Sequence, residues 1–184
     1  MHIDEAAIET IGKIYTRFLP AGGAILDLMS SWRSHIPVSL RPSKLVGVGL
    51  NREEMDDNPA LTDRVVHNIN RKPRLPFGDS SFDGAIVTVS IQYMTRPIEV
   101  FADVGRVLKP LAPFIVTFSN RMFPTKAVAV WRALGDHDRM RLVEKYFVDS
   151  GAFENVQMID RSMPSYPPSD PVFAVLGMRR KEIA

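Results

Sequence analysis

The stretch LPFGDSSFDGAIVTVSIQYMTRPIEVFADVGRVLKP, residues 75–110, determines the fold class. Its apolar run at 82–90 is typical of a short strand that is buried on both faces of a sheet. Residues 97–108 follow with apolar side chains at helical spacing, and they begin at Pro97, a residue favoured at the first position of a helix. A buried strand followed by a helix predicts one repeat of a parallel α/β sheet.

The same alternation extends in both directions from this stretch. Short apolar runs predict four further parallel strands, at 24–28, 44–50, 64–67 and 113–119. Helical spacing predicts three more helices, at 4–19, 125–134 and 137–149. The expected N-caps of the first and last of these helices are Asp4 and Asp136, and Gly151 is the expected left-handed stop.

The C-terminal part departs from this alternation. Two apolar runs, 153–159 and 172–178, are joined by a proline-rich loop at 162–171 with no helix between them. Such a connection favours an antiparallel pair at the edge of the sheet. We therefore predict a single domain over residues 1–184: a doubly wound, mostly parallel, Rossmann-like α/β sheet of seven strands with a C-terminal antiparallel hairpin.

Composition narrows the function classes. The chain has 184 residues, a net charge of +2 and no cysteine, which excludes disulfides, thiolate metal sites and a cysteine nucleophile. Its histidines lack metal-binding spacing, so we expect no metal; they are His2, His35, His67 and His137. The small charge argues against a nucleic-acid partner, and no apolar run is long enough to span a membrane. We expect a cytoplasmic protein, because the N-terminus also lacks a signal-peptide pattern.

The stretch at 75–110 resembles the class I S-adenosylmethionine-dependent methyltransferases of the type 11 group. The matching residues follow the pattern LPF-x-D-x-SFD and, after a strand and a helix, RVLKP: Leu75, Pro76, Phe77, Asp79, Ser81, Phe82, Asp83, Arg106, Val107, Leu108, Lys109 and Pro110. The resemblance spans roughly residues 20–178. It implies the same sheet with a terminal hairpin, S-adenosylmethionine as cofactor and a small-molecule substrate.

The loop that binds the cofactor in that family is altered here. The family has D-x-G-x-G-x-G after its first strand; Asp27 matches, but Met29, Ser31 and Arg33 stand at the glycine positions. The family also ends its second strand with an acid that binds the ribose hydroxyls, and Gly49 stands at that position. RVLKPGG has also become RVLKPLA, without its glycines.

Two interpretations of these changes remain open. In the first, Ser30, Ser31 and backbone amides replace the glycine turn, Trp32 covers the pocket, and Asn51 or Glu54 binds the ribose. The resemblance then implies a cofactor-binding set at the strand ends: Asp27, Met29, Ser30, Ser31, Trp32, Gly49, Asn51, Glu54, Asn68, Asn70 and Ser90. In the second, Asn51 and Glu54 form only a helix N-cap and its partner, and Trp32 only packs.

The acceptor substrate is expected beside this set. Gln92 and Tyr93 follow the strand at 82–90, and Asn120 and Arg121 follow the strand at 113–119. Arg121 is a candidate clamp for an anionic substrate, although a lone loop arginine is more often solvated. We assign no catalytic residue, because methyl transfer depends mainly on positioning.

Two functions therefore compete. The first is a methyltransferase that acts on a small molecule, with a homodimer left open. The second is a catalytically inactive module with the methyltransferase fold that binds a ligand or a partner. An RNA-modifying enzyme is a weaker third hypothesis, because it requires a continuous basic face that the near-neutral charge does not suggest.

Overall fold

A computed structural model describes residues 3–162 and 168–181 of the chain. Seven strands form one sheet in the order β3-β2-β1-β4-β5-β7-β6. Their bounds are β1 (Ala24–Leu28), β2 (Lys44–Gly49), β3 (Asp63–Val66), β4 (Gly84–Thr88), β5 (Pro113–Phe118), β6 (Phe153–Arg161) and β7 (Val172–Arg179). The pairs among β1 to β5 are parallel, and β7 is antiparallel to β5 and β6. The predicted sheet and its terminal hairpin are confirmed.

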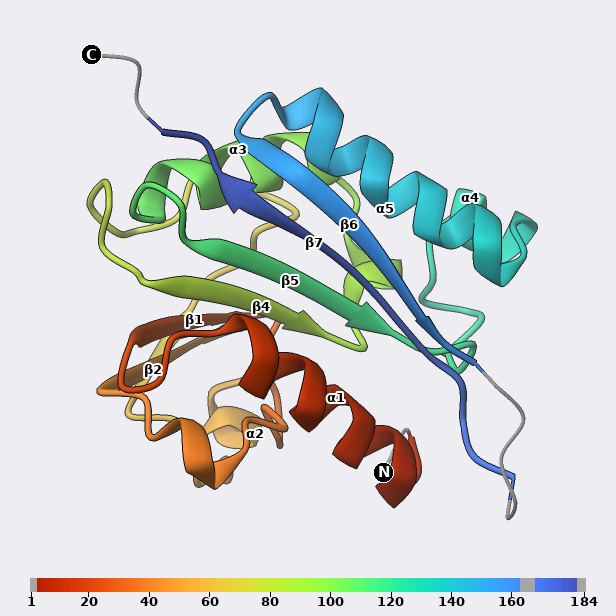
Figure 1. The fold of residues 1–184 in the computed structure, drawn as a ribbon, viewed down its shortest axis with the longest axis horizontal. Coiled ribbons are helices and arrows are strands. Elements are labelled where there is room, and N and C mark those ends of the chain that lie inside the picture. Colours follow the sequence, from red (N-terminus) through yellow and green to blue (C-terminus); the bar gives the residue numbers. More distant parts are fainter. Residues whose placement is uncertain (1–2, 163–167, 182–184) are drawn as a thin grey trace.

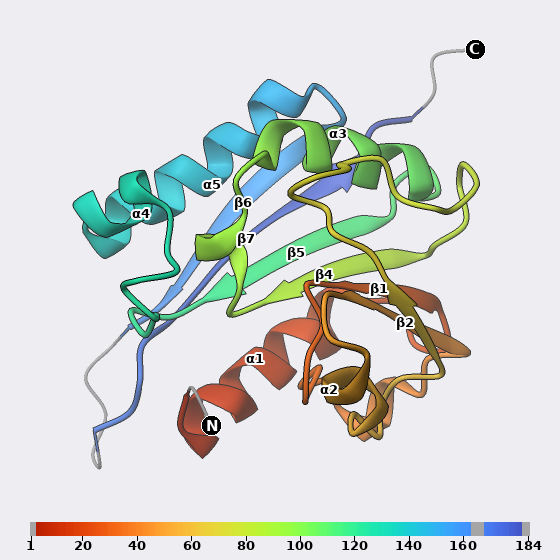
Figure 2. The same cartoon turned by 180° about the vertical axis from the view of Figure 1, so that it is seen from behind.

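The helices cover both faces of this sheet. They are α1 (Glu5–Phe18), α2 (Arg52–Asp56), α3 (Pro97–Val107), α4 (Ala129–Ala133) and α5 (Asp136–Ser150). Figure 1 shows α1 and α2 on one side of the sheet and α3, α4 and α5 on the other, and Figure 2 shows the same three layers from behind. None of these helices in the described part of the chain is long and apolar enough to cross a membrane.

The strand order reverses between β1 and β4. Strand β1 pairs with β2 on one side and with β4 on the other, so the chain winds outward in both directions from this point. In open α/β sheets the ligand crevice lies outside the carboxyl ends of the strands at such a reversal. The segments that follow β1, β2 and β4 therefore meet where a ligand is expected.

Apolar clusters on both faces hold the layers together. On the α3–α5 face, Phe101 contacts Phe114 and Phe147 edge-on, with ring centroids 4.8 Å apart in both pairs. On the other face, the buried Tyr15 of α1 shares hydrogen bonds through its hydroxyl with Thr88 (2.6 Å) and Thr117 (3.1 Å). These contacts fix α1 against the ends of β4 and β5.

Two cationic side chains, Arg106 and Lys109, join the parts of the segment 75–110. Arg106 bonds the Asp103 carboxylate at 2.7 and 2.9 Å, and it also donates to the carbonyl oxygens of Leu75 and Phe77. Lys109 binds Asp83 at 2.7 Å. The motif residues shared with the family thus have structural roles in joining the loop before β4 to α3.

The predicted element boundaries needed three corrections. Asp136 is the first residue of α5 and Gly135 is its N-cap, without a side-chain cap bond, so the cap assigned to Asp136 was wrong. Strand β4 ends at Thr88, because Val89 has a left-handed φ of 50°. The helix predicted at 125–134 is only the short α4. By contrast, Asp4 caps α1 and Gly151 ends α5 at φ 69°, as predicted.

The connection between β1 and β2, residues 29–43, contains no α-helix. We call it the crossover loop; its regular structure is one 3-10 turn (Val38–Leu40). Parallel strands are more usually joined by a helix. Residues 163–167 of the proline-rich loop predicted at 162–171 lie outside the described residues, as does His2.

Candidate functional site

The crossover loop packs directly on the end of β2. Met29 has a left-handed φ of 56°, so the backbone keeps a conformation for which the family uses a glycine. The backbone amide of Ser30 donates to the carbonyl of Val48 at 2.9 Å. A Cβ added to Gly49 would lie 2.3 Å from the carbonyl oxygen of Ser30. An acid at position 49 therefore has no room while the loop keeps this course.

A buried carboxylate anchors the loop. Asp27 accepts hydrogen bonds from the hydroxyls of Ser30 (2.7 Å) and Ser34 (2.5 Å). Burial raises the pKa of Asp27 to about 6, although both hydroxyl bonds act in the opposite direction. The amide of Asn58, also buried, donates to the Ser34 hydroxyl (3.0 Å) and to the Ser31 carbonyl (2.9 Å). The side chain expected to meet the cofactor is thus fully engaged inside the protein.

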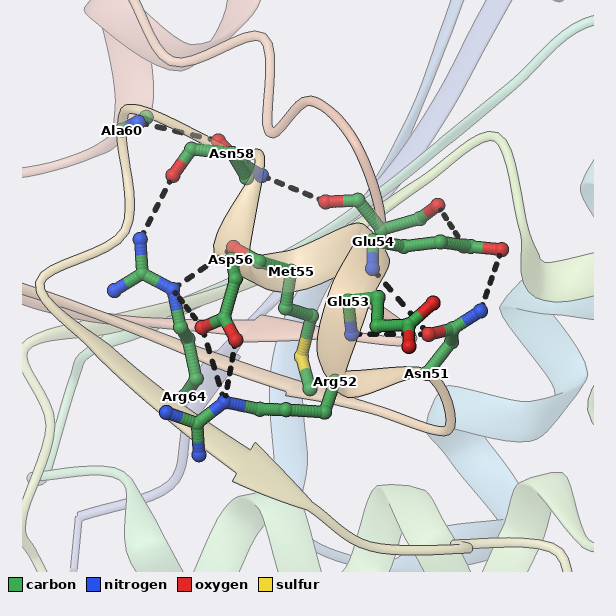
Figure 3. A network of polar contacts seen from close by, with 10 residues as sticks. Asn51, Arg52, Glu53, Glu54, Met55, Asp56, Asn58, Ala60 and Arg64 are labelled. Carbon is green, nitrogen blue, oxygen red and sulfur yellow. Dashed lines mark hydrogen bonds and ion pairs between the residues drawn. The ribbon is translucent and has the colours of Figure 1, made fainter.

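A second carboxylate reaches the same loop from α2. Glu54 accepts from the Ser31 hydroxyl at 2.6 Å. It also accepts from the Asn51 side-chain amide at 3.2 Å (Figure 3). Asn51 also caps α2, because its side-chain oxygen accepts from the backbone amides of Glu53 and Glu54. The helix cap of the second interpretation is therefore present. It also holds a carboxylate against the loop, as the first interpretation requires.

The side chains of Trp32 and Arg33 face outward. Trp32 is 50% exposed. The Arg33 guanidinium donates to the carbonyls of Trp32 (2.6 Å) and Asp57 (3.0 Å), and the latter follows α2. Met29 is half-buried and packs against the main apolar cluster. The side chains at the three glycine positions therefore make different contacts. Met29 packs on the main apolar cluster, Ser31 donates to Glu54, and Arg33 donates to the carbonyls of Trp32 and Asp57.

The asparagines after β3 shape the chain locally. Asn68 closes a turn by accepting from the backbone amides of Asn70 and Arg71. Asn70 donates to the carbonyl of Tyr93 (3.0 Å) and accepts from the backbone amide of Thr95 (2.9 Å). These bonds tie the segment after β3 to the segment after β4. Contact of Asn68 or Asn70 with the cofactor stays a prediction.

Buried polar atoms gather after β4 and β5. Four of them have no hydrogen-bond partner among the described residues: Ser90 Oγ, Gln92 Oε1, Ser119 Oγ and Trp131 Nε1. The structure connects the segments that carry them, because the Val128 amide that precedes α4 donates to the Gln92 carbonyl at 2.9 Å. The Tyr93 hydroxyl instead accepts a hydrogen bond from the Phe123 backbone amide (2.9 Å).

The residues after β5 line a surface cavity of about 450 Å³. Its lining consists of Asn120, Arg121, Met122, Pro124 and Arg132. Arg121 pairs with Asp170 at 2.7 Å, and Asp170 in turn exchanges backbone-to-carboxylate hydrogen bonds with Asp4 at the start of α1. The two predicted substrate residues Asn120 and Arg121 thus share one cavity.

Sequence reasoning missed several members of this region. Asn58 and Ser34 complete the anchor of the crossover loop, while Trp131 and Arg132 of α4 complete the region after β5. The signal for Ser34 is its place in the altered loop, seven positions after Asp27. No spacing in the sequence indicates that α4 returns to the strand ends.

The fit of the family's cofactor can be tested on these atoms. The left-handed Met29 and the partnerless Ser90 hydroxyl suit the methionine end, since a turn and a free hydroxyl are both available there. The usual ribose acid does not fit, because the Ser30 carbonyl fills the space beside Gly49. Glu54 is the carboxylate that the structure brings to the loop instead. In the described part of the chain, no group of three His, Asp or Glu side chains could hold a metal ion.

Comparison with known proteins agrees with this architecture. The family model described as "Methyltransferase domain", of type 11, matches residues 38–116. The Biotin biosynthesis bifunctional protein BioHC of Teredinibacter turnerae is 23% identical over 116 residues, which are 63% of this chain but only 20% of that protein. This chain therefore matches about a fifth of that relative's length.

Solved structures show the same fold at low sequence identity. A SAM-dependent methyltransferase from Thermotoga maritima has a TM-score of 0.66 at 16% identity, over 95% of this chain and 90% of that chain. The [4+2]-cyclase SpnF has a TM-score of 0.69 at 16% identity, over 96% and 82%. At such identities the likeness establishes the fold alone. The family model thus matches residues 38–116, less than half of the chain, and the solved structures share the fold of the chain.

Proposed function

We propose that this chain is an active S-adenosylmethionine-dependent methyltransferase whose acceptor is a small molecule. The observation that carries the proposal is the bond between Glu54 and Ser31, 2.6 Å long, which keeps a carboxylate beside the altered loop. The acid that the family carries on its second strand is missing at Gly49. Glu54 on α2 supplies the same functional group from a neighbouring element.

The residues around Glu54 would hold the cofactor as follows. Glu54 and Asn51 would bind the ribose hydroxyls, Trp32 would stack against the nucleoside, and Ser90 would bond the methionine end. Bound S-adenosylmethionine would supply an electrophilic methyl group. The protein must then place the acceptor in line and exclude water, which needs positioning more than acid–base groups.

Two features support a small acceptor. The cavity after β5 measures about 450 Å³, within the range of about 300–1,000 Å³ typical of small-molecule pockets. The segment between β5 and β6 holds only α4 and α5, so little chain is available to cover a large substrate.

Calorimetric titration with S-adenosylhomocysteine tests the cofactor part. We expect binding, and we expect Glu54→Gln to weaken it about tenfold, because a charged acceptor of two hydroxyl bonds becomes neutral. Glu53→Gln is the matched control, since Glu53 is the exposed neighbouring glutamate on the same helix. Equal losses in both variants would refute the role given to Glu54.

One observation favours a second candidate, a module with this fold that lacks catalysis. The Ser30 carbonyl occupies the place of the ribose acid, and Asp27 is bound by two hydroxyls inside the protein. The structural neighbour SpnF is named as a cyclase, so this fold also serves other activities. Absence of any heat or thermal shift with millimolar S-adenosylhomocysteine would favour this candidate over the methyltransferase.

A further inference from the structure

The fold leaves hydrogen-bonding capacity unused at the carboxyl ends of β4 and β5. Gln92, Ser119 and Trp131 are each at most 3% exposed, yet each carries a polar atom without a partner among the described residues. A buried polar atom that no hydrogen bond satisfies destabilises the fold. Buried polar groups of this kind ordinarily bond water or a ligand. The unused groups therefore indicate a place where a polar molecule is bound.

The surface cavity after β5 adjoins these groups along the chain. Ser119 directly precedes Asn120, and Trp131 directly precedes Arg132, and both of the second residues line the cavity. Met122 and Pro124 add apolar surface to the same lining. The cavity thus combines an apolar wall with polar and cationic groups.

The two arginines of the cavity differ in their partners. Arg121 is neutralised by Asp170, whose carboxylate lies 2.7 Å from its Nε. The guanidinium of the exposed Arg132 makes no hydrogen bond or ion pair with any residue that the structure describes. Two cations and one anion leave a net charge of +1 at the cavity. This charge matches a singly charged carboxylate better than a doubly charged phosphate.

We infer that the cavity binds a small organic carboxylate with an apolar body, and that Arg132 is its main anchor. This inference rests on the proposed function in that it names such a molecule as the methyl acceptor. The planar guanidinium of Arg132 presents two parallel donors to a carboxylate, a geometry that a lysine could not offer. Met122 and Pro124 contact the apolar body, and Arg121, held by Asp170, borders the site.

The two tryptophans of the chain allow a direct test, because each reports on one site. Trp32 stands in the crossover loop, and Trp131 directly precedes Arg132, which lines the cavity. Sodium benzoate is titrated into the ¹⁵N-labelled protein while the two indole N–H signals are followed, with Trp32→Phe for assignment. We expect benzoate to shift the Trp131 signal and S-adenosylhomocysteine to shift the Trp32 signal.

Variants and analogues then separate the outcomes. Arg132→Gln is expected to weaken benzoate binding about tenfold, whereas Arg141→Gln, an exposed arginine of α5, leaves it unchanged. Benzamide, the neutral analogue, is expected to bind far more weakly. Equal binding of benzamide, tighter binding of phenyl phosphate, or no shift of Trp131 with benzoate would each overturn the inference. A missing Trp32 response to S-adenosylhomocysteine would instead overturn the proposed function and leave the carboxylate site standing.

Discussion

Two regions of the molecule keep their shape by opposite means. The framework segment, residues 75–110, follows the family pattern, and its polar contacts pair opposite charges, as between Arg106 and Asp79 and between Lys109 and Asp83. The crossover loop departs from the pattern and is anchored on the buried carboxylate of Asp27, which has only neutral hydroxyl partners, while Glu54 of α2 accepts from the Ser31 hydroxyl. The comparison teaches that ion pairs between separate segments hold the framework. The loop is held mainly by Asp27, a carboxylate whose charged form is destabilised by burial.

The largest effect is expected when the framework loses its central cation. Arg106→Met removes bonds to two carboxylates and two carbonyls, and it leaves Asp103 largely buried without its partner. We expect the free energy of unfolding to fall by about 3 kcal/mol, as for other broken, mostly buried pairs. Urea unfolding measures the change.

The matched control is Arg96→Met, because Arg96 forms an exposed pair with Glu99 at the N-terminal end of the same helix. This control is expected to cost less than about 1 kcal/mol. Similar losses for the two variants would show that the Arg106 contacts do not hold the framework.

The second prediction concerns pH and the loop. Burial raises the pKa of Asp27 to about 6 in the folded protein, above its ordinary value of 3.8. Between these values the folded protein binds more protons than the unfolded chain, so stability falls as pH rises through this range. Relative to Asp27→Asn, the wild type should lose about 3 kcal/mol between pH 3 and pH 8. Urea unfolding of both proteins across that range measures the difference.

The framework should respond to pH in the opposite sense. Burial, the largest single influence, would raise the pKa of Asp103, but the hydrogen bonds from Arg106 and the Leu75 amide and the charges of Arg106 and Arg74 together outweigh it and lower that pKa. Its stabilising contribution is therefore present above the ordinary pKa and is lost as pH falls. If Asp27→Asn and Asp103→Asn changed the pH profile in the same direction, the contrast between the two regions would be wrong.

A somewhat smaller effect tests the packing of the loop on β2. Gly49→Ala places a Cβ 2.3 Å from the Ser30 carbonyl oxygen, so the loop or the strand must shift. We expect a loss of about 2 kcal/mol, typical of overpacking at a rigid site. Gly78→Ala is the control, because its Cβ would meet only the Ser81 hydroxyl at 3.6 Å. A harmless Gly49→Ala, seen by thermal unfolding, would show that the loop is free to move.

The smallest effect is expected at the cap of α2. Asn51→Ala removes the acceptor of two backbone amides and the donor to Glu54. We expect a loss of about 1 kcal/mol, typical of an N-cap, together with weaker binding of S-adenosylhomocysteine because Glu54 is held less firmly. A stability loss without any change in affinity would support a purely structural role for Asn51.

The sequence predicted the framework well because its signals are local. Apolar runs, Pro97 at the start of a helix and the spacing of Asp103 and Arg106 all act over a few residues. The hairpin followed from two apolar runs with no helix between them, and the family resemblance implies the same sheet. Boundaries failed where the backbone conformation decided them, as at Val89 with its positive φ.

The site could be predicted only in outline. The strand ends identified Asp27, Glu54 and Arg121, but not what each of them contacts. The pairing of Arg121 with Asp170 and the approach of Arg132 both join residues that are far apart in the chain or carried by irregular segments. No periodic pattern encodes such contacts, because they depend on how loops pack over a finished sheet.

Asp170 gives the molecule a mechanical link between its two ends. Its carboxylate holds both the Asp4 amide, 166 positions earlier, and Arg121 at the rim of the cavity (the start of α1 lies beside this region in Figure 1). A change at the beginning of α1, such as cleavage, would therefore affect the rim of the cavity after β5 through Asp170 and not through the sheet. An affinity tag fused ahead of α1 should accordingly be judged by its effect on ligand entry as well as on yield.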